Sequence, residues 1–237
     1  MATDILSDAE LEGLRAFDTP TICNALEIVA PERRLYGYTT EPLVCPYPEL
    51  KPICGYARTG TVRATEPSGL AAAEQRKKRL SWYEYVAKGG PLPSVIVLHD
   101  LDGARAGYGS FWGEVNSHIH RGLGAAGVVT DGSIRDIDMN AKGFQMLAKC
   151  IMPSHAWIHN VDIGIEVSIC GMAVKSGDLV HADRHGAVVI PHAVARKIAG
   201  ACDLLARREA VLIDAAKKPG FNFEILAKAI ADSAEIH

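Results

Sequence analysis

The middle of the chain alternates between short apolar β-type runs and helical segments, and this alternation constrains the fold more than any other feature. Residues 94–99 and 127–130 are rich in valine, and each run is followed by aspartate and glycine turn residues. A helix is predicted between them over about 113–125, and a short helix over 136–142 and a strand over 144–148 follow. Strands and helices that alternate at this spacing are typical of a buried, mainly parallel sheet. The sequence therefore predicts an α/β fold.

The flanking segments predict further elements around this core. Before it we expect helices over about 5–17, 20–29 and 69–88, an irregular segment over 30–52, and a strand over 53–62. Ser7 or Asp4 is the candidate N-cap of the first helix, and Asp18 caps the second, which has Pro20 in its first turn.

After residue 165 the pattern changes to short runs separated by glycine turns. We expect antiparallel strands over 165–169, 172–174 and 187–190, with a turn over 181–186, then a helix over 192–216 and a terminal helix over 223–234. The prediction is a single domain over 1–237 with peripheral helices, the N-terminal ones within 1–30 and a C-terminal helical tail over 192–237.

Composition excludes several classes of function. The 237 residues are 48% hydrophobic, with a net charge of −3 and charges of both signs mixed along the chain, so we expect no nucleic-acid partner. The basic run 76–79 lies in a predicted helix and is interpreted as a solvated face. No apolar run approaches the ~18 residues of a membrane span, and the first ten residues lack a signal-peptide pattern. Six cysteines without CxxC spacing are expected to be reduced, as in a cytoplasmic protein.

The segment 109–116 (Gly-Ser-Phe-Trp-Gly-Glu-Val-Asn) contains two glycines and opens a predicted helix. Backbone N–H groups at a helix N-terminus favour an anion, so this segment is a candidate seat for a carboxylate or phosphate. A purely structural turn is an equally good reading of the same residues. The Gly-x-Gly-x-x-Gly spacing of a dinucleotide site and the Gly-Lys-Ser/Thr of a P-loop are both absent from the sequence.

A second polar segment, 131–138, follows the strand predicted over 127–130. Ligands of open α/β sheets bind beyond the carboxyl ends of the strands, so Arg135 and Asp136 are expected at the same edge as Glu114. Arginine binds carboxylates with two hydrogen bonds, and aspartate is a hard oxygen ligand for Mg²⁺. The alternative is an Arg–Asp pair that caps the following helix.

Two pairs of histidines have the i, i+4 spacing that would bind zinc on a helix, namely His155 with His159 and His181 with His185. Neither pair lies in a predicted helix, since the first is in a strand or loop and the second in a turn. Structural hydrogen bonding, or a polar lining of the site, is therefore the favoured interpretation.

Three motifs in order resemble one known family. They are Gly113-Glu114-Val115, the segment 127–136 (GVVTDGSIRD) and the segment 171–191 (GMAVKSGDLVHADRHGAVVIP). They resemble the RraA-like family, which includes class II 4-hydroxy-4-methyl-2-oxoglutarate aldolases and protein inhibitors of ribonuclease E. The resemblance is best over about 94–215, with looser matches over 18–26 and 53–62.

The resemblance implies a swivelling β/β/α-type domain, assembled as a ring-shaped trimer or a dimer of trimers with sites at subunit interfaces. It implies that Asp136 holds a divalent metal, Mg²⁺ or Mn²⁺, largely through waters, and that Arg135 binds a 2-oxo acid. The backbone amides of Gly113, Glu114, Val115 and Asn116 would hold the substrate carboxylate, and Glu114 would tune a water beside the metal. Glu209 of a neighbouring subunit would complete the site.

The function implied is a metal-dependent lyase that cleaves a 4-hydroxy-2-oxo acid to pyruvate through a metal-stabilised enolate, with oxaloacetate decarboxylation as a side activity. Two alternatives remain open: a related sugar-acid lyase or hydratase, and a non-catalytic regulator of a ribonuclease. The intact acid and metal residues favour an enzyme, since binding alone would not require them.

Overall fold

The structure is a computed structural model, and it describes residues 5–237. Its centre is an eight-stranded mixed sheet with the order β10-β9-β1-β2-β4-β3, in which β5 also pairs with β4 and β6 with β1. The strands are β1 (Ile53–Arg63), β2 (Ser94–Asp100), β3 (Ser110–Trp112), β4 (Ala125–Ile134), β5 (Gln145–Ile151), β6 (His159–Ile163), β9 (Leu179–Asp183) and β10 (Gly186–Ile190), and β7 (Val167–Ile169) with β8 (Met172–Val174) forms a separate hairpin.

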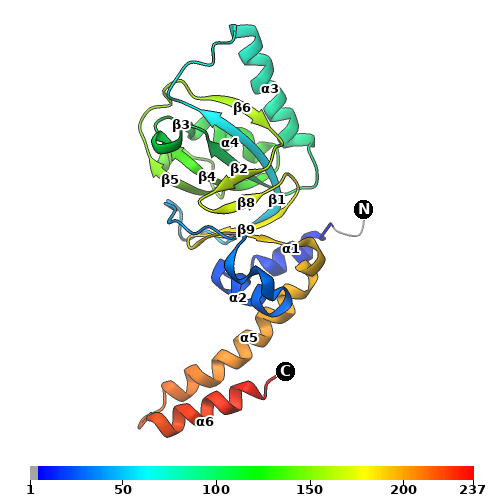
Figure 1. Cartoon of the computed structure of the whole chain (residues 1–237), viewed down its shortest axis with the longest axis vertical. Helices are drawn as coiled ribbons and strands as arrows, with labels where there is room; N and C mark the ends of the chain where they lie inside the picture. The colour runs from blue at the N-terminus through cyan, green and yellow to red at the C-terminus, as the bar shows by residue number, and fades with distance from the viewer. Residues whose placement is uncertain (1–4) are drawn as a thin grey trace.

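Helices cover the sheet and extend beyond it at both ends of the molecule (Figure 1). They are α1 (Asp8–Leu14), α2 (Thr19–Val29), α3 (Ala72–Lys88), α4 (Glu114–Gly122), α5 (Ala195–Ala216) and α6 (Phe223–Ala234), with short 3-10 helices η1 (Pro31–Leu35), η2 (Gly103–Arg105), η3 (Ile137–Met139) and η4 (His192–Val194). The expected mixed α/β fold is thus confirmed, and the order of elements follows the prediction closely.

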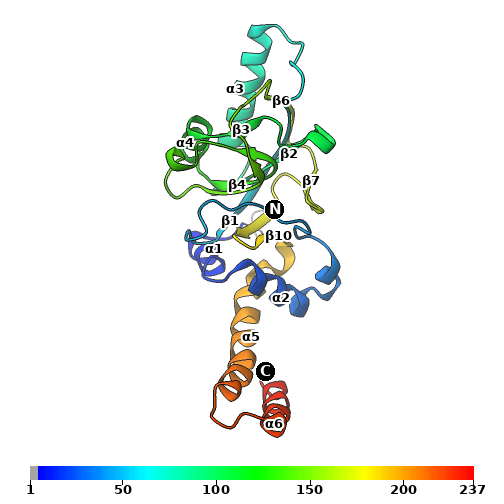
Figure 2. The same ribbon diagram turned by 90° about the vertical axis from the view of Figure 1, so that its left-hand side faces the viewer.

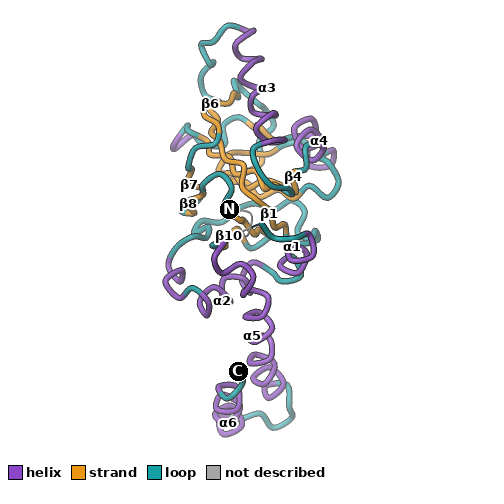
Figure 3. Tube along the Cα trace, turned by 90° about the vertical axis from the view of Figure 1, so that its right-hand side faces the viewer, coloured by secondary structure: helices purple, strands orange, loops and turns teal. Residues whose placement is uncertain are grey.

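Side chains on the two faces of β2 show how the core is divided. Val95 and Val97 pack in a cluster with the β7–β8 hairpin, whereas Ile96 and Leu98 pack with Trp82 of α3 and with residues around α4. Alternate residues of a strand point to opposite faces, so a continuous apolar run serves two core clusters. A third cluster joins α1, α2 and α5 to β1, β9 and β10, and Figure 3 shows these helices below the strands.

The predicted helix caps are found where the structure describes them. Ser7 and Glu10 form a capping box at α1, and Asp18 accepts a hydrogen bond from the Thr21 amide at the start of α2. Asp4, the other candidate cap of the first helix, lies outside the described residues.

Four local predictions were wrong. The turn expected over 181–186 is mostly strand, because Leu179–Asp183 forms β9 and pairs with both β1 and β10. β4 does not end at Asp131-Gly132 but continues to Ile134, and the three residues of β3 had not been expected. The helix expected over 136–142 is a single 3-10 turn, η3, because Asp136 before it has a left-handed backbone conformation.

The C-terminal helices form an arm that leaves the body of the molecule. α5 packs against α2 at its start and against α6 further along, and Figures 1 and 2 both show the α5–α6 hairpin projecting away from the sheet. Exposed apolar side chains on this hairpin include Ile213, Phe223 and Ile230. Within residues 5–237, no helix combines the length and the apolar character needed to cross a membrane. All six cysteines lie in the described region and form no disulfide there.

A buried histidine ties α3 to α4. The Trp82 indole N–H donates to Nε2 of His120 at 2.8 Å, so Nδ1 carries the proton and donates to the Asn116 carbonyl at 2.7 Å. His120 is fully buried, and this burial lowers its pKa to about 4. The imidazole is therefore neutral in the folded chain at neutral pH.

We expect the protein to lose stability as the pH falls from 7 to 5. An unfolded histidine, with a pKa of about 6.5, binds a proton in this range, whereas folded His120 does not until the pH approaches 4, so each such histidine lowers the free energy of unfolding by about 2 kcal/mol at pH 5. His181, also buried with a pKa of about 4, adds to the effect.

Thermal unfolding midpoints at the two pH values measure the loss. His120→Gln should reduce the loss, and His118→Gln, an exposed position on the same helix, should leave it unchanged; equal losses in the two variants would contradict the assignment.

Candidate functional site

The short strand β3 sets the geometry of the site. β3 runs parallel to the end of β4, with Trp112 beside Ile134, and the Arg135 amide continues the pairing by donating to the Trp112 carbonyl at 2.9 Å. The carboxyl ends of the two strands therefore meet at one edge of the sheet. α4 begins directly after β3, so its N-terminus lies against the residues that follow β4.

Asp136 contacts the first turn of α4. Its backbone has φ 54° and ψ 42°, a left-handed conformation that costs a non-glycine residue about 1 kcal/mol or more. Its Oδ2 atom accepts a hydrogen bond from the Glu114 amide at 3.2 Å. The carboxylate makes no capping bond to η3, although Asp136 holds the N-cap position of that helix. The alternative, in which the Arg135–Asp136 pair only caps the following helix, is therefore not supported by a capping bond at η3.

The chain after Asp136 is held in place by two side chains. Tyr47 donates its hydroxyl to the Ile137 carbonyl at 2.5 Å, and Asn140 donates its amide to the Arg135 carbonyl at 2.9 Å. These bonds fix the turn on both sides of the strained residue.

Gly113 permits the close approach of Asp136 to α4. A Cβ atom on Gly113 would lie 2.5 Å from Oδ2 of Asp136 and 3.1 Å from Cγ of Arg135. Since real Cβ atoms do not approach a neighbour this closely, glycine is required by space here and not by its backbone angles. The same residue is the N-cap of α4 and brings no side chain to cap it.

The first turn of α4 has amide groups available for a ligand. Amides at the first positions of a helix have no acceptor within the helix, and the partial positive charge there favours an anion. The Glu114 amide is used by Asp136, which leaves those of Val115 and Asn116, and the Val115 side chain is exposed beside them. The structure thus supports the expected anion seat, with one of its donors already bound to Asp136.

Arg135 and Asp136 lie at the surface of this seat. The Nε atom of Arg135 is 3.7 Å from Oδ2 of Asp136, and each side chain is about one third exposed, at 35% and 32%. Both groups therefore remain accessible to a small ligand. The distance is longer than a good hydrogen bond, so the guanidinium keeps donors for a second carboxylate.

Other carboxylates at this edge of the sheet have structural partners. Asp100, Asp102 and Asp131 each accept hydrogen bonds from backbone amides of nearby turns, at 2.7–3.0 Å. Asp131 also contacts the His99 ring, a hydrogen bond that raises the pKa of the histidine. Asp136 accepts one amide hydrogen bond and is partly exposed, so its carboxylate retains capacity for a ligand.

Glu209 does not join this site within one chain. It is exposed on α5 next to Arg208, which donates to the Ile236 carbonyl after α6. The α5–α6 hairpin projects away from the sheet (Figure 1). A contribution to the site is therefore open only to a Glu209 of another subunit. Among residues 5–237, no group of three or more histidine, cysteine or acidic side chains has a metal-binding arrangement.

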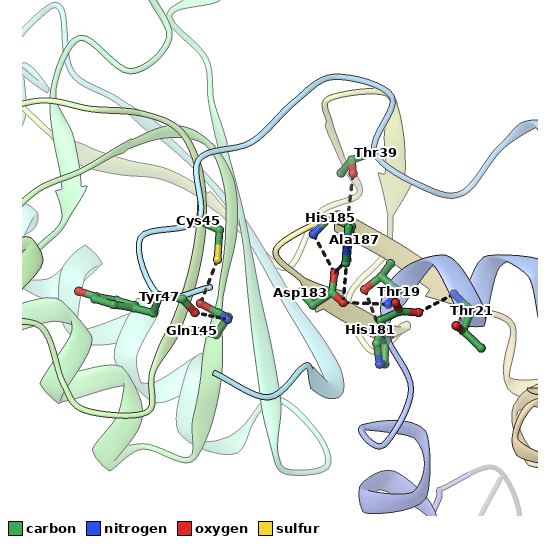
Figure 4. Close-up of polar contacts among 11 residues, drawn as sticks. Thr19, Thr21, Thr39, Cys45, Tyr47, Gln145, His181, Asp183, His185 and Ala187 are labelled. Carbon is green, nitrogen blue, oxygen red and sulfur yellow. Dashed lines mark hydrogen bonds and ion pairs between the residues drawn. The ribbon is translucent and has the colours of Figure 1, made fainter. Parts of the chain in front are cut away.

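The histidine pairs form no zinc site in the described part of the chain. His181 is buried on β9 with Nδ1 3.0 Å from the Thr19 hydroxyl, and Nδ1 of His185 lies 3.1 Å from Asp183, which also accepts from the Thr19 amide (Figure 4). This network fastens the start of α2 to the β9–β10 hairpin. His155 bonds the carbonyl of Ala156 in the loop before β6. These three histidines therefore make hydrogen bonds within the fold.

A cavity that the sequence had not revealed adjoins the anion seat. It has a volume of about 420 Å³ and lies between α3, the first turn of α4 and β6. Tyr83 of α3 donates its hydroxyl to the Asn116 side chain at 2.8 Å, and both residues line the cavity. The basic run 76–79, interpreted as a solvated face, contributes Arg76, Lys78 and Arg79 to its rim, and Arg76, Lys77 and Arg79 are exposed.

Parallel strands that present an arginine and a strained aspartate against a helix N-terminus define an α/β domain with a candidate anion site beside a partly exposed carboxylate. The model of the RraA-like family, described as Aldolase/RraA, matches residues 19–189. The chain belongs to this family, and the resemblance seen in the sequence is confirmed.

Solved structures share the fold at low sequence identity. An uncharacterized protein from Pseudomonas syringae pv. tomato superimposes with a TM-score of 0.70 at 21% identity, covering 96% of this chain and 95% of that one. RraAS2 of Streptomyces coelicolor, described as an unusual member of the RNase ES inhibitor RraA protein family, gives a TM-score of 0.66 at 20% identity, covering 90% and 98%.

One curated relative is an uncharacterized protein, MJ0644, of Methanocaldococcus jannaschii. It is 37% identical over 81 residues, which are 33% of this chain and 39% of that protein. The match thus spans well under half of the relative's length.

We expect Gly113→Ala to displace the Asp136 carboxylate, because the added methyl would lie 2.5 Å from Oδ2. Binding of Mn²⁺, followed by electron paramagnetic resonance, should weaken about tenfold or more, the range seen when a metal ligand loses its support. Gly122→Ala, on the same helix with open space around its Cα atom, is the matched control and should bind like wild type. Unchanged binding in Gly113→Ala would show that the close approach has no role in the site.

Proposed function

We propose that this chain is a divalent-metal-dependent lyase that cleaves a 4-hydroxy-2-oxo acid to pyruvate, with oxaloacetate decarboxylation as a side activity. The observation that carries the proposal is the Asp136 carboxylate, held in a strained conformation 3.2 Å from the Glu114 amide and next to Arg135. Strained residues that the surrounding structure holds in place are concentrated at active sites. Membership of a family described as Aldolase/RraA agrees with this proposal.

The donor set fits Mg²⁺ or Mn²⁺. Asp136 is a hard oxygen ligand that is one third exposed, and Mg²⁺ is usually held by one or two carboxylates while it keeps several waters. The metal, when bound, would supply Lewis-acid polarisation of the substrate's keto group.

The residues of the chain bind and orient the substrate. The amides of Val115 and Asn116 at the start of α4 would hold the carboxylate of the 2-oxo acid. The Arg135 guanidinium lies at the other side of Asp136 and would donate to the oxygen on which negative charge develops as the C3–C4 bond breaks.

Glu114 is the candidate for proton transfer. It is the first residue of α4, half-buried, and its own amide bonds Asp136. Through a water it would take the proton of the C4 hydroxyl as that carbon becomes a carbonyl, and it would return the proton to C3 to give pyruvate. The proton and the electrons of the broken bond are then all accounted for within substrate and site.

We propose a homotrimer, or a dimer of trimers, as the working form, with Glu209 of one subunit at the site of the next. The projecting α5–α6 hairpin supports this proposal, because it carries exposed apolar side chains, and large exposed apolar patches mark interaction surfaces.

The alternative is a regulator of a ribonuclease, because RraAS2 of Streptomyces coelicolor is described as an unusual member of the RNase ES inhibitor RraA protein family. At 20% sequence identity, the similarity of RraAS2 to this chain shows a shared fold alone. A sugar-acid lyase or hydratase would use the same residues on another substrate.

We expect pyruvate release from oxaloacetate and from 4-hydroxy-4-methyl-2-oxoglutarate to depend on added Mg²⁺, and to fall by about 10²-fold or more in Asp136→Asn, which removes the negative charge of the proposed ligand. Asp138→Asn, an exposed carboxylate two residues away, is the matched control and should retain wild-type rates. Release in a coupled lactate dehydrogenase assay measures both.

No release from either substrate, with Mn²⁺ bound normally, would move the proposal to another 2-oxo acid lyase. Absence of both release and metal binding would refute the enzyme and favour the regulator.

For Glu209 we expect subunit complementation. Glu209→Gln and Asp136→Asn proteins should each be impaired, and unfolding and refolding them together should restore about a quarter of wild-type activity, since random mixing places an intact Glu209 beside an intact Asp136 in that share of interfaces. If the mixture is no more active than its parents, the sites are not shared, and a fully active Glu209→Gln would remove Glu209 from the site altogether.

A further inference from the structure

Residues 44–47, in the segment without predicted regular structure, are fastened to the edge of β5. Val44 and Ala148 exchange backbone hydrogen bonds at 2.7 and 3.0 Å, as in an antiparallel pair. Gln145, only 1% exposed, donates its side-chain amide to the Tyr47 carbonyl at 3.2 Å, and Figure 4 shows the Tyr47 ring pointing away from Gln145. A strand edge and a buried side chain therefore fix the backbone of Tyr47.

The hydroxyl of Tyr47 reaches the turn that follows β4. It donates to the Ile137 carbonyl at 2.5 Å, directly after Asp136, and Asn140 donates to the Arg135 carbonyl at 2.9 Å, directly before it. Burial raises the pKa of Tyr47, and a hydrogen bond with the Asn140 side chain opposes this rise, so the hydroxyl keeps its proton at neutral pH. Neutral donors thus brace Asp136 on both sides.

The conformation of Asp136 depends on such support. With φ 54° and ψ 42°, it has a backbone that a non-glycine residue keeps only where the surrounding structure holds it. The Met139 amide donates to the Asp136 carbonyl at 2.9 Å, and the Glu114 amide donates to Oδ2 at 3.2 Å. If Tyr47 no longer satisfied the Ile137 carbonyl, that carbonyl would be free to rotate toward water, and the Asp136 carboxylate would turn with it.

We propose that Tyr47 is a positioning residue for Asp136. Its hydroxyl holds the turn in which the carboxylate faces the first turn of α4, and in this way it raises the affinity of the site for a divalent cation. Tyr47 acts through Asp136 and not on the substrate, since its hydroxyl is used by the Ile137 carbonyl. The inference rests on the proposed function for the identity of the ligand, whereas the effect on the turn is a property of the metal-free chain.

The test variant is Tyr47→Phe, which removes the hydroxyl and retains the ring. The ring packs, partly buried, against the core cluster that contains Trp112 and Phe144, so the fold should remain. Tyr38→Phe is the matched control, because Tyr38 lies in the same irregular segment and donates its hydroxyl to the Arg34 carbonyl at 3.3 Å. Each variant loses one bond from a hydroxyl to a backbone carbonyl, but only Tyr47→Phe loses it beside Asp136.

The first measurement is hydrogen exchange of backbone amides in the metal-free protein, followed by NMR. The Glu114 and Met139 amides both donate to Asp136, so they report on the turn directly. Both should exchange about tenfold faster in Tyr47→Phe, since one lost hydrogen bond shifts a local opening equilibrium by a factor of this order. Neither should change in Tyr38→Phe.

The second measurement is Mn²⁺ binding, followed by electron paramagnetic resonance. The affinity should fall about tenfold in Tyr47→Phe, the lower end of the range for residues that orient a metal ligand, and should be unchanged in Tyr38→Phe. Thermal unfolding midpoints separate this effect from a loss of stability. Unchanged Mn²⁺ affinity in Tyr47→Phe would overturn the inference, and a lower midpoint alone would mean that the hydroxyl only stabilises the fold.

The two proposals fail in different ways. If Mn²⁺ binds but no pyruvate is released, the proposed reaction on these substrates fails, and a weaker Mn²⁺ affinity in Tyr47→Phe would still establish the positioning role. If the wild type binds no Mn²⁺, the proposed function fails and amide exchange decides the inference. Faster exchange confined to Tyr47→Phe would then support it, and equal exchange in the two variants would refute it.

Discussion

The hydrogen bond from the Arg135 amide to the Trp112 carbonyl is the contact on which the site depends. It extends the parallel pairing of β3 and β4 by one residue, and so brings the start of α4 against the end of β4. Together with the β3–β4 pairing and the Glu114 amide bond to Asp136, it fixes the distance between Asp136 and the first amides of α4. Loops at the carboxyl ends of parallel strands carry function in many α/β folds because the sheet holds them rigidly.

Charge is arranged around this contact in two opposite zones. Asp136 supplies a negative charge at the end of β4, whereas the first turn of α4 presents partial positive charge beside it. In the proposed function, a metal at Asp136 would neutralise part of the charge of an acidic ligand head. His120 adds no charge beneath α4, because burial lowers its pKa to about 4 and the imidazole stays neutral at neutral pH.

The molecule also divides into a body and an arm. The body contains the sheet and every residue that one chain brings to the site, whereas the α5–α6 arm carries Glu209 and exposed apolar side chains outward (Figure 2). Glu209 is far from the site of its own chain, so it can contribute to a site only if another copy of the chain brings one close to the arm. The proposed trimer gives the arm a physical role that a monomer would not.

The sequence by itself determined the mixed α/β class, most element positions, the family and the residues that deserved attention, because apolar periodicity, caps and motif order are local properties. It placed α2 with its Asp18 cap and α6 closely, since capping and turn residues mark those ends.

Only the tertiary structure decided what depends on pairing between distant segments. β3 is three residues long and carries no periodicity, and Asp131-Gly132 resembles a strand end, yet pairing with neighbouring strands extends β4 past it. The turn expected over 181–186 became β9 for the same reason, because β1 and β10 supply its partners. The basic run of α3 was readable from the sequence as a solvated face, and Arg76, Lys77 and Arg79 are exposed in the structure.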